Sequence, residues 1–158
     1  CLAVAIARRS PRARIHAIEV SSAAVAVARE NAAAHQVLDR IEFHAGADLA
    51  VLTEMADCDL LVSNPPYIPS GQIARLDPEV RDFDPRLALD GGMDGLCIYR
   101  LLAREGVRLV RPGGRMMLEI GDDQSTAVSE LLVDHNWVVE AVERDYTGRP
   151  RLVVALPA

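Results

Sequence analysis

Apolar residues along the chain follow two different spacings. Short runs that alternate or are rich in Val, Ile and Leu predict strands at residues 14–20, 40–46, 58–63, 115–121, 137–143 and 151–156. Longer segments with apolar residues three and four positions apart predict helices at residues 1–10, 22–35, 95–110 and 124–136. Strands that alternate with helices favour βαβ units, so we expect an α/β fold with a mostly parallel sheet.

The connections refine this picture. The last two predicted strands are joined by the short segment RDYTGRP, which is too short for a parallel crossover, so the final strand should run antiparallel. The RPGG stretch at residues 111–114 predicts a tight turn before a strand. Ser21 and Ser22 are suited to cap the helix that follows them. The first helix has neither an N-cap nor a strand before it.

A polar, proline-containing segment interrupts the alternation at residues 68–92. It contains Pro69, Pro78 and Pro85 among many charged residues, and we expect a long loop or a small hairpin insertion. Long segments of this kind are more often functional than simple connectors. We expect the whole chain, residues 1–158, to be a single domain that contains this segment as an insertion.

Composition narrows the class of protein. Apolar residues make up 50% of the chain and charged residues 25%, as in ordinary globular proteins. The formal net charge of −6 argues against a large basic surface for nucleic acid. No apolar run approaches the roughly 18 residues that cross a bilayer, and the opening residues do not have the pattern of a secretory leader. We therefore expect a cytoplasmic protein that binds no membrane.

Cysteines and histidines give no sign of a metal site. The cysteines are far apart and form no CxxC pair, which is typical of reduced thiols. They are Cys1, Cys58 and Cys97. The histidines are scattered and share no evident acidic partner in the sequence. They are His16, His35, His44 and His135. We interpret all of them as ordinary residues and expect no metal.

Three polar residues follow predicted strands. Glu19 ends the first strand, Asp48 follows the second and Asn64 follows the third. Ligands of open α/β sheets bind at the carboxyl ends of the strands. A carboxylate at the first position can accept both hydroxyls of a ribose, and Asp48 could accept the amine of an adenine. Acidic residues after strands are also common as helix caps or solvated loop residues. No GxGxxG phosphate-binding fingerprint occurs in the chain.

The segment VSNPPYIP is the most specific signal. The side-chain carbonyl of Asn64 and the backbone carbonyl of Pro65 are two acceptors that can hold both hydrogens of an –NH₂ group. Tyr67 offers a flat face for a planar amide or nucleobase. Such a site suits methylation of a planar nitrogen, with catalysis by proximity and electrostatics. A rigid proline loop without a ligand is the plainer alternative.

Several further segments make the sequence resemble the release factor glutamine N5-methyltransferase family. The resemblance extends over essentially the whole chain. It rests on AIE at residues 17–19, VSNPPYIP at 62–69, EVRDFDPRLALDGGMDGLCIYR at 79–100, RPGGRMMLEIG at 111–121 and RDYTGRPRLVVA at 144–155. It implies a Rossmann-like class I S-adenosylmethionine-dependent methyltransferase fold. It also implies that the enzyme methylates the glutamine of the Gly-Gly-Gln motif in peptide chain release factors.

The resemblance assigns roles to individual residues. It implies that Glu19 binds the ribose of S-adenosylmethionine and that Asp48 and Leu49 lie beside the adenine. Asn64 would contact both the cofactor and the substrate amide. Pro65, Pro66 and Tyr67 would complete the substrate pocket, bordered by residues 68–92. Glu119, Asp145 and Arg151 match family-like segments, but we assign them no role.

The chain departs from the family at its beginning. Members of the family have a central first strand followed by a glycine-rich cofactor loop, and neither is found before the helix at residues 1–10. We therefore expect a catalytic domain that lacks its first strand. As written, it would bind the cofactor weakly or not at all and expose an apolar slot in its sheet.

Two other functions remain open. The first is a nucleic-acid adenine N6-methyltransferase, which presents the same kind of –NH₂ group but has to extract the base from its stack. The second is an inactive, truncated remnant that acts as an interaction module.

Overall fold

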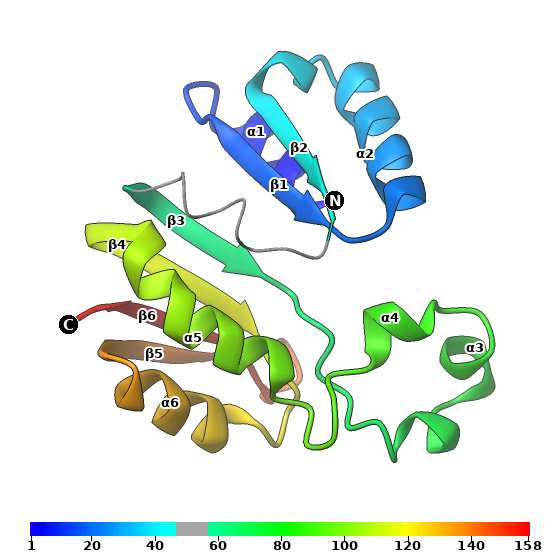
Figure 1. Cartoon of the computed structure of the whole chain (residues 1–158), viewed down its shortest axis with the longest axis vertical. Coiled ribbons are helices and arrows are strands. Elements are labelled where there is room, and N and C mark those ends of the chain that lie inside the picture. The colour runs from blue at the N-terminus through cyan, green and yellow to red at the C-terminus, as the bar shows by residue number, and fades with distance from the viewer. Residues whose placement is uncertain (47–56) are drawn as a thin grey trace. The chain divides into compact units, whose positions relative to one another are not determined.

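The computed structural model describes residues 1–46 and 57–158, which belong to two compact units, Cys1–Glu54 and Met55–Ala158 (Figure 1). Among the described residues, no helix is long and apolar enough to cross a membrane.

The first unit is a two-stranded parallel sheet covered by helices. Strand β1 (Ile15–Glu19) pairs with β2 (Ile41–Ala45), and helices α1 (Leu2–Arg9) and α2 (Ser22–Ala34) contribute to a shared apolar core. A short 3₁₀ helix, η1 (Leu38–Arg40), precedes β2. The hydroxyl oxygen of Ser21 accepts a hydrogen bond from the Ala24 amide at 3.2 Å, which confirms the expected cap of α2.

The second unit is a four-stranded sheet in the order β3-β4-β6-β5. Strand β3 (Cys58–Ser63) runs parallel to β4 (Val110–Glu119). Strand β6 (Pro150–Pro157) is antiparallel to both β4 and β5 (Trp137–Arg144), as the short connection predicts. Helices α5 (Cys97–Leu109) and α6 (Ser125–Asp134) pack on the sheet and on each other, and their apolar residues form the main core.

The predicted tight turn at residues 111–114 is wrong in one respect. These residues lie inside β4 as a bulge, since the register passes from Cys58 opposite Val110 to Leu60 opposite Arg115. Pro112 has no N–H to donate to the neighbouring strand, and bulges are among the few places in a sheet where proline is tolerated. The turn residues therefore interrupt the pairing but do not end the strand.

Residues 68–92 form helical turns and not a hairpin. They contain η3 (Ile73–Arg75), α3 (Pro78–Arg81) and α4 (Arg86–Leu89). Pro78 is at the first position of α3, where its missing N–H costs nothing. The segment returns to its starting point, because Ile68 and Asp90 form an isolated parallel bridge. It is therefore closed at its base, directly after the NPPY residues.

The expected single sheet is the main difference from the sequence prediction. The described strands form two sheets, because β1 pairs with β2 alone and β3 pairs with β4 alone. The family resemblance expects a central first strand, and none of the described residues forms it. In the sheets of the described residues, the edge strands are β1 and β2 in the first unit and β3 and β5 in the second.

Candidate active site

Asn64 lies where the sequence predicts, directly after the last residue of β3. Asn64 is exposed, whereas Pro65 is buried and Pro66 is half-buried. Within the described part of the chain, neither the Asn64 side chain nor the Pro65 carbonyl oxygen takes part in a hydrogen bond. Asn64 is therefore open to solvent at the carboxyl end of the strand, whereas Pro65 is not.

The other side of the NPPY loop is fixed by close backbone contacts. A Cβ atom on Gly91 would lie 2.7 Å from the Pro66 carbonyl oxygen. A Cβ atom on Gly95 would lie only 2.3 Å from the Tyr67 carbonyl oxygen, and Gly95 has a φ of +76°. Only glycine fits this approach and this backbone conformation. The GGMDG segment at residues 91–95 thus supports the NPPY loop through its glycines.

Gln124 connects three loops through its buried side chain. Its Nε2 donates to the Tyr67 carbonyl oxygen at 3.0 Å and to the Gly95 carbonyl oxygen at 3.4 Å. Its Oε1 accepts from the Gly121 amide at 3.0 Å. Gln124 is 8% exposed, and among the described residues it is the single polar one that is buried. Because a buried amide without partners is costly, these bonds hold the three loops in one arrangement.

Tyr67 is half-buried and packs against the core of the second unit. It lies near Tyr99, a buried residue of α5 whose hydroxyl donates to the Glu119 carbonyl oxygen at 2.7 Å. Burial, followed by the nearby Tyr67 and Glu119, raises the pKa of Tyr99 well above its ordinary value. Tyr99 therefore remains a neutral donor that fixes the end of β4.

The base of the 68–92 segment is closed by Asp90. Its carboxylate accepts from the Ser70 hydroxyl at 2.5 Å and from the Gly92 amide at 3.0 Å. These hydrogen bonds, that of Ser70 first, lower the pKa of Asp90 and keep it ionised. The segment is thus anchored beside the NPPY loop at both of its ends.

Glu19 is the last residue of β1 and is half-buried. Its Oε1 accepts from the Ser21 amide at 2.9 Å, so one carboxylate oxygen shapes the turn into α2. No hydrogen bond involves its Oε2 in the described part of the first unit. Asp48 and Leu49, the predicted adenine neighbours, lie outside the described residues.

Glu119, Asp145 and Arg151, to which the sequence assigns no role, make hydrogen bonds that stabilise the fold. Glu119 contributes its backbone carbonyl to Tyr99. Asp145 accepts from the Thr147 hydroxyl at 2.6 Å and from the Thr147 and Arg149 amides, which closes the turn between β5 and β6. Arg151 donates to the Ile120 carbonyl oxygen at 2.9 Å. These contacts account for the strand-end and turn chemistry of the three residues.

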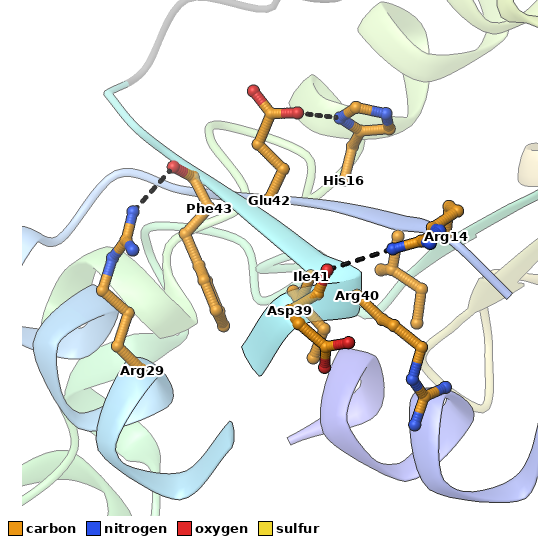
Figure 2. A pocket seen from close by; sticks show the side chains of 9 residues that line it. Arg14, His16, Arg29, Asp39, Arg40, Ile41, Glu42 and Phe43 are labelled. Atoms are coloured by element: carbon orange, nitrogen blue, oxygen red, sulfur yellow. Dashed lines mark hydrogen bonds and ion pairs between the residues drawn. The ribbon is translucent and has the colours of Figure 1, made fainter. Parts of the chain in front are cut away.

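A hollow of about 330 Å³ lies along β2 in the first unit, and Figure 2 shows its lining. Three arginines line it, and each donates to a backbone carbonyl oxygen: Arg14 to Asp39, Arg29 to Phe43, and Arg40 to Ala7 and Ser10. None of the predicted site residues that the structure describes lines this hollow. Gln124, Gly95 and Tyr99 were missed by sequence reasoning, because their roles depend on contacts between loops that are far apart in the chain.

The chain is similar to known proteins both in sequence and in fold. Residues 1–76 match the family model described as a methyltransferase small domain. The ribosomal protein L11 methylase from Lactobacillus delbrueckii subsp. bulgaricus has a similar fold, with a TM-score of 0.68 at 17% identity over 99% of this chain and 63% of that one. The Rossmann-like fold is that of class I methyltransferases, and the family model matches the first half of the chain.

Sequence comparison is more specific. The chain is 45% identical to the release factor glutamine methyltransferase of Cereibacter sphaeroides over 100% of its length and 56% of that protein. It is 48% identical to the protein of the same name from Caulobacter vibrioides over 97% of its length and 53% of that protein. It therefore spans about half the length of these relatives. By sequence, the chain belongs to the release factor glutamine methyltransferase family.

Proposed function

We propose that this chain forms the substrate-binding part of an enzyme that methylates N5 of the glutamine in the Gly-Gly-Gln motif of peptide chain release factors. The observation that carries the proposal is the position of Asn64, which follows β3 with its side chain exposed and its loop supported from behind. The names of the curated relatives support the choice of substrate.

The chemistry follows from the acceptors of the loop. The Asn64 side-chain carbonyl and the Pro65 carbonyl accept the two N–H groups of the substrate amide, which fixes the plane of that amide. Its nitrogen lone pair is delocalised and weakly nucleophilic, so orientation matters more than a strong base. The partial positive charge that develops on the nitrogen is stabilised by the same two oxygens. The proton that leaves can pass to solvent, because Asn64 is exposed.

S-adenosylmethionine would supply the methyl group as an electrophile on a sulfonium sulfur. Glu19 is suited to hold its ribose, because the carboxylate lies at the end of a parallel strand and Ser21 occupies only one of its oxygens. Asp48 and Leu49 complete the proposed adenine side. The enzyme would act in the cytoplasm, where release factors are found, with no stable contact to nucleic acid or membrane.

A chimera tests the proposal, because the chain corresponds to about half of its relatives. Residues 1–158 replace the 159-residue stretch of the Cereibacter sphaeroides protein that they match. The chimera should transfer labelled methyl groups to a release factor, and Asn64→Ala should lower the rate at least about 100-fold, as loss of one oriented contact to the transition state does. Asn31→Ala, an exposed residue of α2, is the matched control and should leave the rate unchanged.

A folded chimera whose Asn64→Ala variant is as active as the control would remove Asn64 from the mechanism. Circular dichroism of each variant separates loss of folding from loss of transfer.

A further inference from the structure

The sheet of the first unit has one apolar face and one polar face. Ile15, Ala17, Ile41 and Phe43 belong to the core formed with α1 and α2. Side chains alternate along a strand, so the residues between them point away from this core. The parallel register sets His16 opposite Glu42 and Ile18 opposite His44. It therefore brings His16, Glu42 and His44 together on the polar face.

The sequence prediction that the histidines lack a common acidic partner is therefore wrong for His16 and His44. His16 Nδ1 lies 3.2 Å from His44 Nε2 and 3.5 Å from a Glu42 carboxylate oxygen. His44 Nε2 lies 3.7 Å from the other oxygen of Glu42. One ligand atom from each residue can be chosen so that all three lie within 4.8 Å of one another. Figure 2 shows the Glu42 side chain directed toward the ring of His16.

These spacings match a metal site. Zinc binds imidazole nitrogen and carboxylate oxygen at about 2.0–2.2 Å, so two of its ligands in a tetrahedron lie about 3.4 Å apart. The 3.2 Å between the two imidazole nitrogens lies near this value, and each nitrogen lies 3.5 or 3.7 Å from one of the two Glu42 carboxylate oxygens. Two imidazoles and one carboxylate form a donor set that suits zinc better than magnesium or calcium, which prefer oxygen ligands.

The surroundings allow an ion to enter. The side chains of His16 and Glu42 are 39% and 66% exposed, and that of His44 is 16% exposed. Arginines of the same hollow donate to backbone carbonyl oxygens and do not pair with Glu42 in the described part of the first unit. The carboxylate thus remains available to a cation.

We propose that His16, Glu42 and His44 form a zinc site with three protein ligands and a fourth position for water. The ligands come from both strands of a two-stranded sheet, and such a sheet is only marginally stable alone. Bound zinc would link β1 to β2 and stabilise the first unit by mass action. The proposal is independent of the methyltransferase activity.

Zinc titration of the whole chain tests the site. The variant that is titrated carries Cys1→Ser, Cys58→Ser and Cys97→Ser, because free thiols also bind zinc. Calorimetry should give one zinc per chain. Histidine-ring ¹⁵N spectra should show that zinc binds His16 through Nδ1 and His44 through Nε2, as the distances require.

Variants separate this site from other zinc binding. Glu42→Gln and His44→Ala should each weaken binding by about 10- to 100-fold or more. His35→Ala, an exposed histidine after α2, is the matched control and should leave the affinity unchanged. Absence of zinc binding, binding that survives both site variants, or ring nitrogens of His16 and His44 that do not shift would overturn the proposal. The ring spectra of the unsubstituted site decide the matter even where a variant misfolds.

Discussion

Gln124 holds the NPPY loop in place, and removing its side chain should destabilise the second unit measurably. Gln124→Ala deletes three hydrogen bonds and leaves the carbonyls of Tyr67 and Gly95 and the amide of Gly121 without their partner. Each such bond contributes about 1 kcal/mol, and an unsatisfied buried group costs about 1–3 kcal/mol. Since Gln124 is almost fully buried, we expect a total loss of about 2–4 kcal/mol in the free energy of unfolding.

The single tryptophan provides the assay. Trp137 is buried in the second unit, and its ring nitrogen donates to the Ala103 carbonyl oxygen at 2.8 Å, so its fluorescence reports the unfolding of this unit. For urea slopes of about 1–3 kcal/mol per M, a loss of about 3 kcal/mol lowers the midpoint by about 1–3 M. Gln124→Glu should also destabilise the unit, because it keeps an acceptor for Gly121 but loses the donor to Tyr67.

The exposed Gln72 is the matched control, and Gln72→Ala should change the stability by less than about 0.5 kcal/mol. A Gln124→Ala variant as stable as Gln72→Ala would refute the role of Gln124 as the connection between these loops.

Three further predictions concern the same unit. Gly95→Ala should lower the free energy of unfolding by about 2 kcal/mol or more, because its Cβ would lie 2.3 Å from the Tyr67 carbonyl oxygen. Gly148 has a similar φ of +82° but open space around it, so Gly148→Ala is the control. The difference between the two urea midpoints isolates the effect of the clash. Tyr99→Phe should cost about 1–2 kcal/mol by thermal unfolding, since it leaves the Glu119 carbonyl without its donor, and a midpoint equal to that of the parent would contradict this. Hydrogen bonds, above all the one from the Thr147 hydroxyl, lower the pKa of Asp145 from 3.8 to about 2. The ionised Asp145 therefore contributes stability above pH 3.8, and this contribution is lost as the pH falls toward 2. Asp145→Asn should flatten this part of the pH–stability curve, and an unchanged curve would contradict the prediction.

The sequence predicts well those features that depend on local patterns. β3 is found at the predicted residues, and Asn64 follows it, because an apolar run that meets two prolines has one natural end. The antiparallel last strand follows from the length of one connection. The cap at Ser21 depends only on its immediate neighbours.

Features that depend on contacts between distant segments could not be predicted in this way. Gln124 looks like an ordinary residue at the start of a helix, and only the folded chain brings it to the Tyr67 carbonyl. The parallel register that brings His16 to Glu42 is likewise invisible in the separate strands. Residues 111–114 have the composition of a turn, yet β4 continues through them, because it pairs with β3 both before them, at Val110, and after them, from Arg115.

The substrate of the NPPY loop is the central claim, and its most direct test is the position of the transferred methyl group. The chimera with residues 1–158 is incubated with labelled S-adenosylmethionine, a release factor and DNA together, and mass spectrometry locates the mark. The account predicts a methyl group on the glutamine of the Gly-Gly-Gln motif and none on the DNA. A methyl group on DNA adenine, with the release factor unmodified, would contradict it.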